Sequence, residues 1–300
     1  MQKPNQSQEE NTGHPPVRIA YLIMAHSGLD FLDRLIASLN DDNSAFYVHV
    51  DKKADRNYVS HLTNVAVLSD RSDVNWACYS QTQAEVSLLQ RAIEFHSDYY
   101  ILISGADYPI RPRQFLYDLL SSGNEFISTC KVPTAHKPLS RFESHYFEYD
   151  RRARSAKSYG LRLTEAAVRV AWKKKTIPFE LYAGSSWFAL TRAAVMHVLS
   201  TLEEDPRYEG FFKTCLCADE AMFQTILANS RFKDRITHNL TYTDWSTNPA
   251  PAVIGDKHIE LFKKQVTFTS VYGEYTPFFA RKFDPGNTRM LDLVDRQLRQ

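Results

Sequence analysis

An apolar run near the start of the chain limits the fold more than any other feature of the sequence. Residues 17–25 read VRIAYLIMA, with Pro15-Pro16 before them and His26-Ser27-Gly28 after them. A continuous apolar segment of this length between turn-forming residues is typical of a parallel strand that is buried on both faces. We therefore predict that this run is the first strand of an α/β protein.

The segments that follow continue this pattern. Apolar residues recur at helical spacing from Leu29 to Leu39, and a second short apolar run from Ala45 to Val50 ends at Asp51. Strand, helix and strand in this order form a βαβ unit with Asp51 at the carboxyl end of its second strand. Ligands of open α/β sheets bind at that edge, so position makes His26 and Asp51 candidates for a nucleotide site. Both residues also fit ordinary turns.

A third acidic candidate lies in the turn Ser104-Gly-Ala-Asp107-Tyr-Pro109, directly after another apolar run. Asp107 is thereby predicted at the same ligand-binding edge of the sheet. The chain contains neither a Gly-x-Gly-x-x-Gly pattern nor a P-loop, which excludes the common dinucleotide and nucleoside triphosphate motifs. We predict further strands at 65–68, 99–103 and 183–190, and further helices at 81–95 and 192–202.

Composition limits the class of protein and its partners. With 300 residues, of which 43% are hydrophobic, the chain is large enough for one enzyme-sized α/β unit. Its formal charge of +1 gives no bulk electrostatic reason to expect a nucleic acid partner. The four cysteines lack paired zinc-type spacing, and no run approaches the about 18 apolar residues that span a bilayer. The polar first residues are unlike a signal peptide, so we expect reduced thiols in a soluble, cytoplasmic protein.

Residues 128–178 have a different character, with few apolar runs, many aromatic residues and a dense basic cluster. We interpret them as the acceptor-facing region. Within them, apolar residues from Leu163 to Ala171 share one helical face that ends at Trp172 and three lysines. We favour a helix docked on the core with a solvated basic end; a basic amphipathic helix on an anionic membrane surface is the alternative. The basic cluster comprises Arg141, Arg151, Arg152, Arg154 and Lys157.

Two adjacent carboxylates, Asp219 and Glu220, stand where a helical apolar pattern begins. Asp219 is predicted to cap the helix or to be an anion of its first turn, which leaves Glu220 free to face a cleft as a catalytic base. The local pattern also fits an ordinary acidic helix start without chemistry. The apolar residues that define this helix are Met222, Phe223, Ile226 and Leu227.

Four groups of short segments, in a fixed order from about residue 17 to 285, carry a resemblance to a known family. They resemble the core-2 and I-branching β-1,6-N-acetylglucosaminyltransferases, glycosyltransferase family 14, which also contains the peptide O-xylosyltransferases. Because a membrane anchor and paired cysteines are missing, we expect a bacterial-type soluble member. The segments are IAYLIMAH (19–26) with FYVHVDKK (46–53), VNWACYS (74–80) with ISGADYP (103–109), GSSWF (184–188) with DE (219–220), and FARKFD (279–284).

This resemblance implies a GT-A-type fold, with a mostly parallel central sheet flanked by helices. It also implies inverting transfer from a UDP-sugar, GlcNAc or xylose first, without a metal, to a hydroxyl of a glycan or lipid-linked glycan. We expect a disordered tail at 1–16 and one catalytic domain at 17–300, with its nucleotide-binding half at 17–125 and its acceptor-binding and catalytic half at 126–300. The implied site residues are Glu220 as general base, Asp51 at the uridine, Trp76 near the uracil, Lys282 at the diphosphate and Trp245 in the acceptor site.

The chemistry of the residues agrees with these roles. A single displacement needs a base for the acceptor hydroxyl and positive charge at the departing diphosphate. The chain has no Asp-x-Asp motif, so Arg281 and Lys282, which lie between aromatic residues, are the best substitute for a metal ion. The family usually has a second cation about twenty positions earlier, where Lys263 or Lys264 stands here. Trp187 and Asp219 are assigned with Trp245 to the substrate side, although a lone Trp also fits the core.

Two other functions remain open. The first is a non-catalytic protein that binds a nucleotide-sugar or glycan with the same fold. The second is a glycoside hydrolase, which needs two carboxylates about 5–10 Å apart. Asp219 and Glu220 are sequence neighbours, and neighbouring side chains on a helix do not face each other, so we rank the hydrolase last. We also retain a membrane surface, contacted peripherally, among the partners of this protein.

Overall fold

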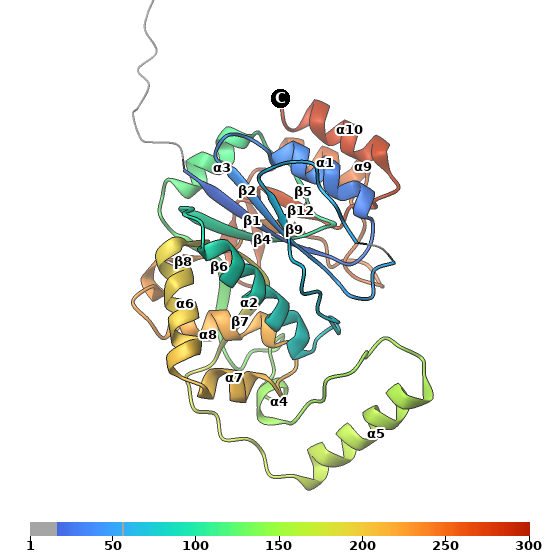
Figure 1. The fold of residues 1–300 in the computed structure, drawn as a ribbon, viewed down its shortest axis with the longest axis vertical. Coiled ribbons are helices and arrows are strands. Elements are labelled where there is room, and N and C mark those ends of the chain that lie inside the picture. The colour runs from blue at the N-terminus through green and yellow to red at the C-terminus, as the bar shows by residue number, and fades with distance from the viewer. Residues whose placement is uncertain (1–16, 56) are drawn as a thin grey trace, which may run out of the picture.

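A computed structural model describes residues 17–55 and 57–300, so the tail expected at 1–16 lies outside the described residues. The chain folds around a seven-stranded sheet with helices on both faces (Figure 1). β1 is parallel to β2 and β4, β2 to β3, and β6 to β8, whereas β7 is antiparallel to β4 and β6. This mostly parallel α/β sheet confirms the predicted fold class. In spatial order the strands are β3 (Val65–Val67), β2 (Ser44–Val50), β1 (Ile19–Ala25), β4 (Tyr99–Ser104), β7 (Tyr182–Thr191), β6 (Glu125–Lys131) and β8 (Ile236–Thr237).

The apolar run that opens the fold is a central strand, as predicted. Tyr21 and Ile23 of β1 belong to one buried cluster, together with helix α1 (Leu29–Leu39). Ala20 and Leu22 belong to a second buried cluster on the other face. Because both faces of β1 are covered, its residues do not alternate between apolar and polar, and the strand is apolar throughout. The helices that contribute to the second cluster are α2 (Tyr79–Ile93), α6 (Arg192–Glu204), α7 (Arg207–Phe212) and α8 (Met222–Ala228).

A small second sheet joins distant parts of the chain at the carboxyl edge of β4. Strand β12 (Phe279–Arg281) pairs antiparallel with β5 (Tyr108–Pro109) and parallel with β9 (Thr241–Thr243). This pairing brings Arg281 next to the turn that carries Asp107. The other elements are α3 (Arg113–Leu120), α4 (Ser140–Glu143), α9 (Asp256–Lys264), α10 (Thr288–Gln297), the hairpin β10 (Phe268–Ser270) and β11 (Gly273–Tyr275), and the 3-10 turns η1 (Ala218–Glu220) and η2 (Lys233–Arg235).

Strands β6 and β7 approach each other very closely at Gly184. A Cβ atom at this position would lie 1.6 Å from the carbonyl oxygen of Ser128, and the register of the two strands shifts between Ile127 and Thr129. Only glycine fits such an approach without moving the backbone. The close contact fixes the part of β7 that immediately precedes Ser186 and Trp187.

Residues 143–175, which we call the arm, extend away from the body of the protein and carry helix α5 (Ala156–Ala171) (Figure 1). The prediction of a helix docked on the core is wrong: Leu163 and Val170 are 74% and 89% exposed. The buried residues of α5 are instead Ser158 and Glu165. The reason is an ion pair between Glu165 and Arg151, which holds the polar face of α5 against the preceding segment of the arm.

Candidate active site

Asp51 lies where the sequence places it, in the turn directly after β2. Its backbone N–H donates to the carbonyl of Ala25 at the end of β1, 2.8 Å away, and its buried carboxylate accepts from the backbone N–H of Lys53. The next residue after β1 is His26. Partial burial, followed by the positive charge of Lys282, lowers the pKa of His26. The residues that follow β1 and β2, His26 and Asp51, therefore lie close to Lys282.

Asp107 and Arg281 form the buried part of the same region. The Asp107 carboxylate accepts from the backbone N–H of Ser104 at 2.9 Å, and its second oxygen lies 3.5 Å from Nε of Arg281. Burial raises the pKa of Asp107, and the charge of Arg281 opposes this shift. The Arg281 guanidinium also lies 4.1 Å from the centre of the Trp187 ring. Asp107 thus neutralises much of the charge of Arg281.

Lys282 is half-buried beside two further cations. Burial lowers the pKa of its ammonium, and the charges of Arg281 and Arg152 act in the same direction. In the described parts of the chain, its Nζ atom has no hydrogen bond or ion pair. A desolvated ammonium among like charges is unfavourable unless an anion from outside joins it. This position is therefore suited to a phosphate group.

The third cation, Arg152, comes from the arm. Its guanidinium lies 4.8 Å from the centre of the Trp76 ring, and Trp76 itself is exposed. The structure thus links Trp76 to the Lys282 region through Arg152, which the sequence marked only as one of a basic cluster. The place of Trp76 near a uracil stays a prediction. No spacing rule links Arg152 to Trp76, because the two belong to different segments.

Two predicted residues lie apart from this group. Lys263 stands in the last turn of α9, where its ammonium donates to Glu260 at 2.7 Å. No contact among the described residues joins Lys263 to Lys282. Trp245 is 71% exposed in the loop after β9, next to Asp244. The Trp245 side chain is available to a ligand, and its assignment to an acceptor stays a prediction.

Glu220 forms the second half of the site. Its Oε2 atom lies 2.5 Å from Nζ of Lys137 and 2.8 Å from a guanidinium nitrogen of Arg141. The Glu220 side chain is 28% exposed, and within the described chain its Oε1 atom has no hydrogen-bond partner. Two cations therefore orient the carboxylate while one oxygen stays accessible. Sequence reasoning missed Lys137 and placed Arg141 only in the basic cluster.

Asp219 points in the opposite direction from its neighbour. Its carboxylate accepts hydrogen bonds from the hydroxyl of Ser186 at 2.5 Å and from the amide of Gln81 at 2.9 Å. Burial, followed by the charge of Glu220, raises the pKa of Asp219 to about 7. The predicted cap role is wrong, because α8 begins at Met222 without a side-chain cap. Tertiary partners on β7 and α2 take up the Asp219 carboxylate instead.

Strand β7 connects the two halves. Leu102 of β4 pairs with Phe188, so Ser186 and Trp187 lie beside the last residues of β4, at its carboxyl end. Successive side chains of a strand point to opposite faces, so Ser186 contacts the Asp219–Glu220 turn while Trp187 contacts Arg281. The site thus combines an accessible carboxylate with the ammonium of Lys282, which has no ion pair among the described residues.

Tyr272, in the turn between β10 and β11, is a further site residue without a sequence signal. Burial raises its pKa, and the charges of Cys130 and Glu220 add to this effect. The phenol therefore lies within electrostatic reach of Glu220 and of Arg141, whose charge lowers the same pKa.

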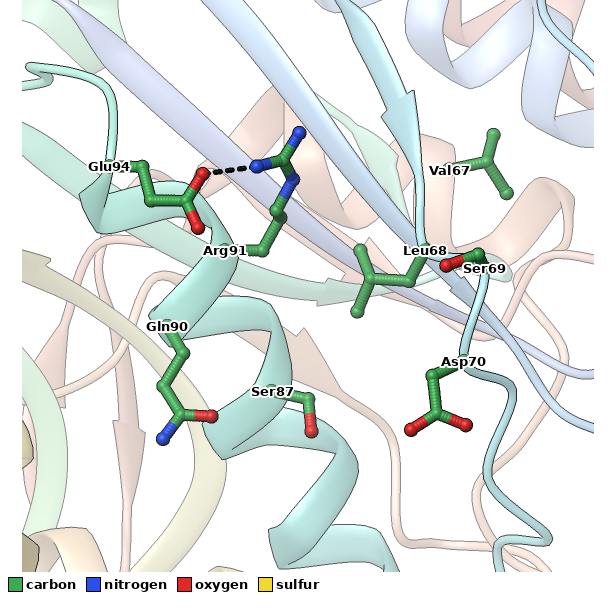
Figure 2. Close-up of a pocket in the computed structure, with 8 residues that line it drawn as sticks. All are labelled: Val67, Leu68, Ser69, Asp70, Ser87, Gln90, Arg91 and Glu94. Atoms are coloured by element: carbon green, nitrogen blue, oxygen red, sulfur yellow. Dashed lines mark hydrogen bonds and ion pairs between the residues drawn. The ribbon is translucent and has the colours of Figure 1, made fainter.

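A hollow elsewhere holds none of the predicted residues. It has a volume of about 420 Å³ and lies between the end of β3 and the second half of α2, where Arg91 pairs with Glu94 (Figure 2). Across residues 17–55 and 57–300, no three His, Cys, Asp or Glu side chains are grouped so that they could hold a metal ion.

Comparisons with known proteins give a consistent result. The sequence model of a family described as "Branch: Core-2/I-Branching enzyme" matches residues 19–266. Xylosyltransferase 2 from Mus musculus is 28% identical over 318 aligned residues, which cover 97% of this chain and 35% of that protein. Xylosyltransferase 1 from Homo sapiens is 27% identical over 250 residues, which cover 77% of this chain and 24% of that protein. The chain spans about a third of the length of xylosyltransferase 2.

Proposed function

The chain belongs to the Core-2/I-branching enzyme family, and from this membership we propose that it is a glycosyltransferase that acts with inversion on a UDP-sugar. The acceptor in this proposal is a hydroxyl of a glycan or glycoconjugate. Similarity to proteins named xylosyltransferase supports UDP-xylose as the first donor to test, and UDP-GlcNAc is the second.

The unpaired ammonium of Lys282 is the observation that carries the proposal. In a single displacement, the bond between the anomeric carbon and the diphosphate oxygen breaks, and negative charge develops on the departing UDP. Lys282, supported by Arg281 and Arg152, would stabilise that charge without a divalent ion. The uridine would then lie toward Asp51 and Trp76.

Glu220 supplies the base in this mechanism. Its accessible Oε1 accepts the proton of the acceptor hydroxyl while that hydroxyl oxygen forms the new bond to the anomeric carbon. Lys137 and Arg141 hold the other carboxylate oxygen, so the base is oriented before substrate binds. Asp219 has no direct role in this proposal, since its carboxylate is bonded to Ser186 and Gln81.

Calorimetric titration with UDP in EDTA, combined with a UDP-sugar turnover assay, tests the proposal. We expect UDP to bind in EDTA, and Glu220→Gln to lower turnover about a thousandfold while the Kd for UDP changes less than about twofold. Glu203→Gln, an exposed carboxylate on α6, is the control and should behave like the wild type. A strict requirement for Mn²⁺, or full turnover by Glu220→Gln, would contradict the mechanism. UDP binding without turnover of any UDP-sugar would favour the non-catalytic alternative.

A further inference from the structure

Helix α5 exposes one face of apolar side chains, and the two residues that it buries, Ser158 and Glu165, are polar. The apolar residues recur at intervals of four, three, one and three positions, which places them on one face of the helix. Tyr159, Leu163 and Val170 are the large members of this face, and all three are exposed. We call this face the α5 stripe; it consists of Tyr159, Leu163, Ala166, Ala167 and Val170.

Specific contacts hold the stripe toward solvent. Arg151 donates two hydrogen bonds to the carboxylate of Glu165, at 3.0 and 2.7 Å, and the backbone N–H of Phe147 donates a third at 3.0 Å. The side chains of Arg151 and Glu165 are only 12% and 6% exposed. Turning the stripe inward would break this buried ion pair, which is strongly unfavourable. The outward orientation of the stripe is therefore built into the arm.

The arm also concentrates positive charge. Residues 151–175 contain nine Lys or Arg and a single acidic residue, Glu165, whereas the whole chain has a formal charge of only +1. Glu165 is already neutralised by Arg151. Lys157 and Lys173 are exposed at the two ends of α5, and the exposed ring of Trp172 directly follows the helix. Residues 151–175 of the arm thus present an apolar stripe with basic ends and no exposed carboxylate.

We propose that the α5 stripe docks this protein on an anionic lipid surface. Tyr159, Leu163 and Val170 enter the boundary between head groups and acyl chains, and the lysines at the helix ends contact lipid phosphates. Charge complementarity favours this occupant, because a second copy would bring equally basic residues to the contact. Nucleic acid would leave the stripe exposed to water. No described helix is both long enough and apolar enough to cross a bilayer, and an interfacial helix does not need to cross.

The position of the arm gives this contact a use. The arm begins just after Arg141, whose guanidinium donates to Glu220, and its Arg152 lies over the ring of Trp76. A lipid surface bound by α5 therefore lies on the side of the molecule from which an acceptor attached to lipid would approach. The docking itself does not depend on the proposed transferase activity.

Co-flotation of the full-length protein with vesicles tests the docking. With vesicles of phosphatidylcholine containing about one third phosphatidylglycerol, we expect the wild type to float and the double variant Leu163→Ser/Val170→Ser to bind at least about tenfold more weakly. The double variant Lys157→Gln/Lys173→Gln should also bind these vesicles more weakly than the wild type. On vesicles of phosphatidylcholine alone, this difference between variant and wild type should disappear. Met196→Ser, which changes an exposed apolar residue on α6, is the matched control and should float like the wild type.

Thermal unfolding and UDP titration of the same variants keep the result interpretable. Because the substituted side chains are exposed, melting temperatures and UDP affinity should match the wild type. Wild-type protein that stays at the bottom of the gradient, or equal flotation of the Leu163→Ser/Val170→Ser variant, would overturn the docking. A dimer that this variant dissociates would assign the stripe to a second copy instead. Failure of UDP to bind would count against the transferase proposal alone.

Discussion

The two halves of the candidate active site are built in different ways. In the nucleotide half, Asp51 and Asp107 follow directly on buried strands, and backbone N–H groups hold their carboxylates. In the base half, Glu220 stands on a short 3-10 turn, and its contacts are with the side chains of Lys137, in a loop, and Arg141, in the short helix α4. The sheet therefore determines the first half, whereas long-range ion pairs determine the second.

After Glu220→Gln, the largest effect is expected from Lys282→Met in the nucleotide half. Removal of the unpaired ammonium should lower turnover about 100- to 1,000-fold, since it removes charge stabilisation of the leaving group. UDP affinity should fall as well, which calorimetry measures. Lys263→Met is the matched control, because its ammonium already pairs with Glu260. If both variants lost turnover and UDP affinity equally, Lys263 would also have to contact the diphosphate, as the sequence predicted.

A smaller and qualitatively different loss is expected from Arg141→Met in the base half. Glu220 would keep Lys137 but lose one of its two orienting contacts. We expect kcat to fall about tenfold to a hundredfold while the KM for the donor stays unchanged. Arg141→Lys should recover part of the loss. A raised KM for the donor with a normal kcat would mean that Arg141 contributes to donor binding rather than to the orientation of Glu220.

Substitution of Asp219 tests the base half through the pH dependence of the free energy of unfolding. Its pKa of about 7 in the folded protein exceeds that of an unfolded Asp, so the folded state binds the proton more tightly. The contribution of Asp219 to stability should thus be largest below about pH 4 and decline as the pH rises toward 7, by up to about 1.4 kcal/mol per pH unit. Asp219→Asn should show a flatter pH dependence in urea unfolding than the wild type or the exposed control Asp42→Asn. Parallel curves for Asp219→Asn and the wild type would contradict the buried, protonated carboxyl.

The smallest effect concerns Arg152, which reaches from the arm into the nucleotide half. Arg152→Gln should weaken UDP binding about two- to fivefold, as expected for loss of an exposed cation near an aromatic ring. The difference should shrink at high salt, because the charge is exposed. Arg154→Gln, two positions along the same segment, is the control. Equal affinities of the Arg152→Gln and wild-type proteins would exclude the arm from donor binding.

The sequence predicted the nucleotide half well for a physical reason. A strand buried on both faces must be apolar throughout, so β1 and the turns after β2 and β4 stand out, and α1 has the predicted bounds Leu29–Leu39. The roles of Asp51 and Asp107 remain predictions, but their place at one edge of the sheet follows from topology.

The remaining features depend on contacts between distant segments. An amphipathic pattern shows which residues of α5 share a face, but only the Arg151–Glu165 pair decides which face is covered. Likewise, the local pattern made Asp219 a helix cap, whereas Ser186 and Gln81 take up its carboxylate. No local rule predicts such partners, because they become neighbours only when the fold is complete.

The pairing of β12 with β5 also determines when the site can appear during synthesis. A ribosome that has released residues 17–275 has already supplied every strand of the seven-stranded sheet. At that stage Asp107 still lacks Arg281, and Lys282 has not yet emerged. Under the proposed mechanism, donor binding therefore requires residues that leave the ribosome last, because a chain that ends before Phe279 contains the sheet strands without Arg281 and Lys282.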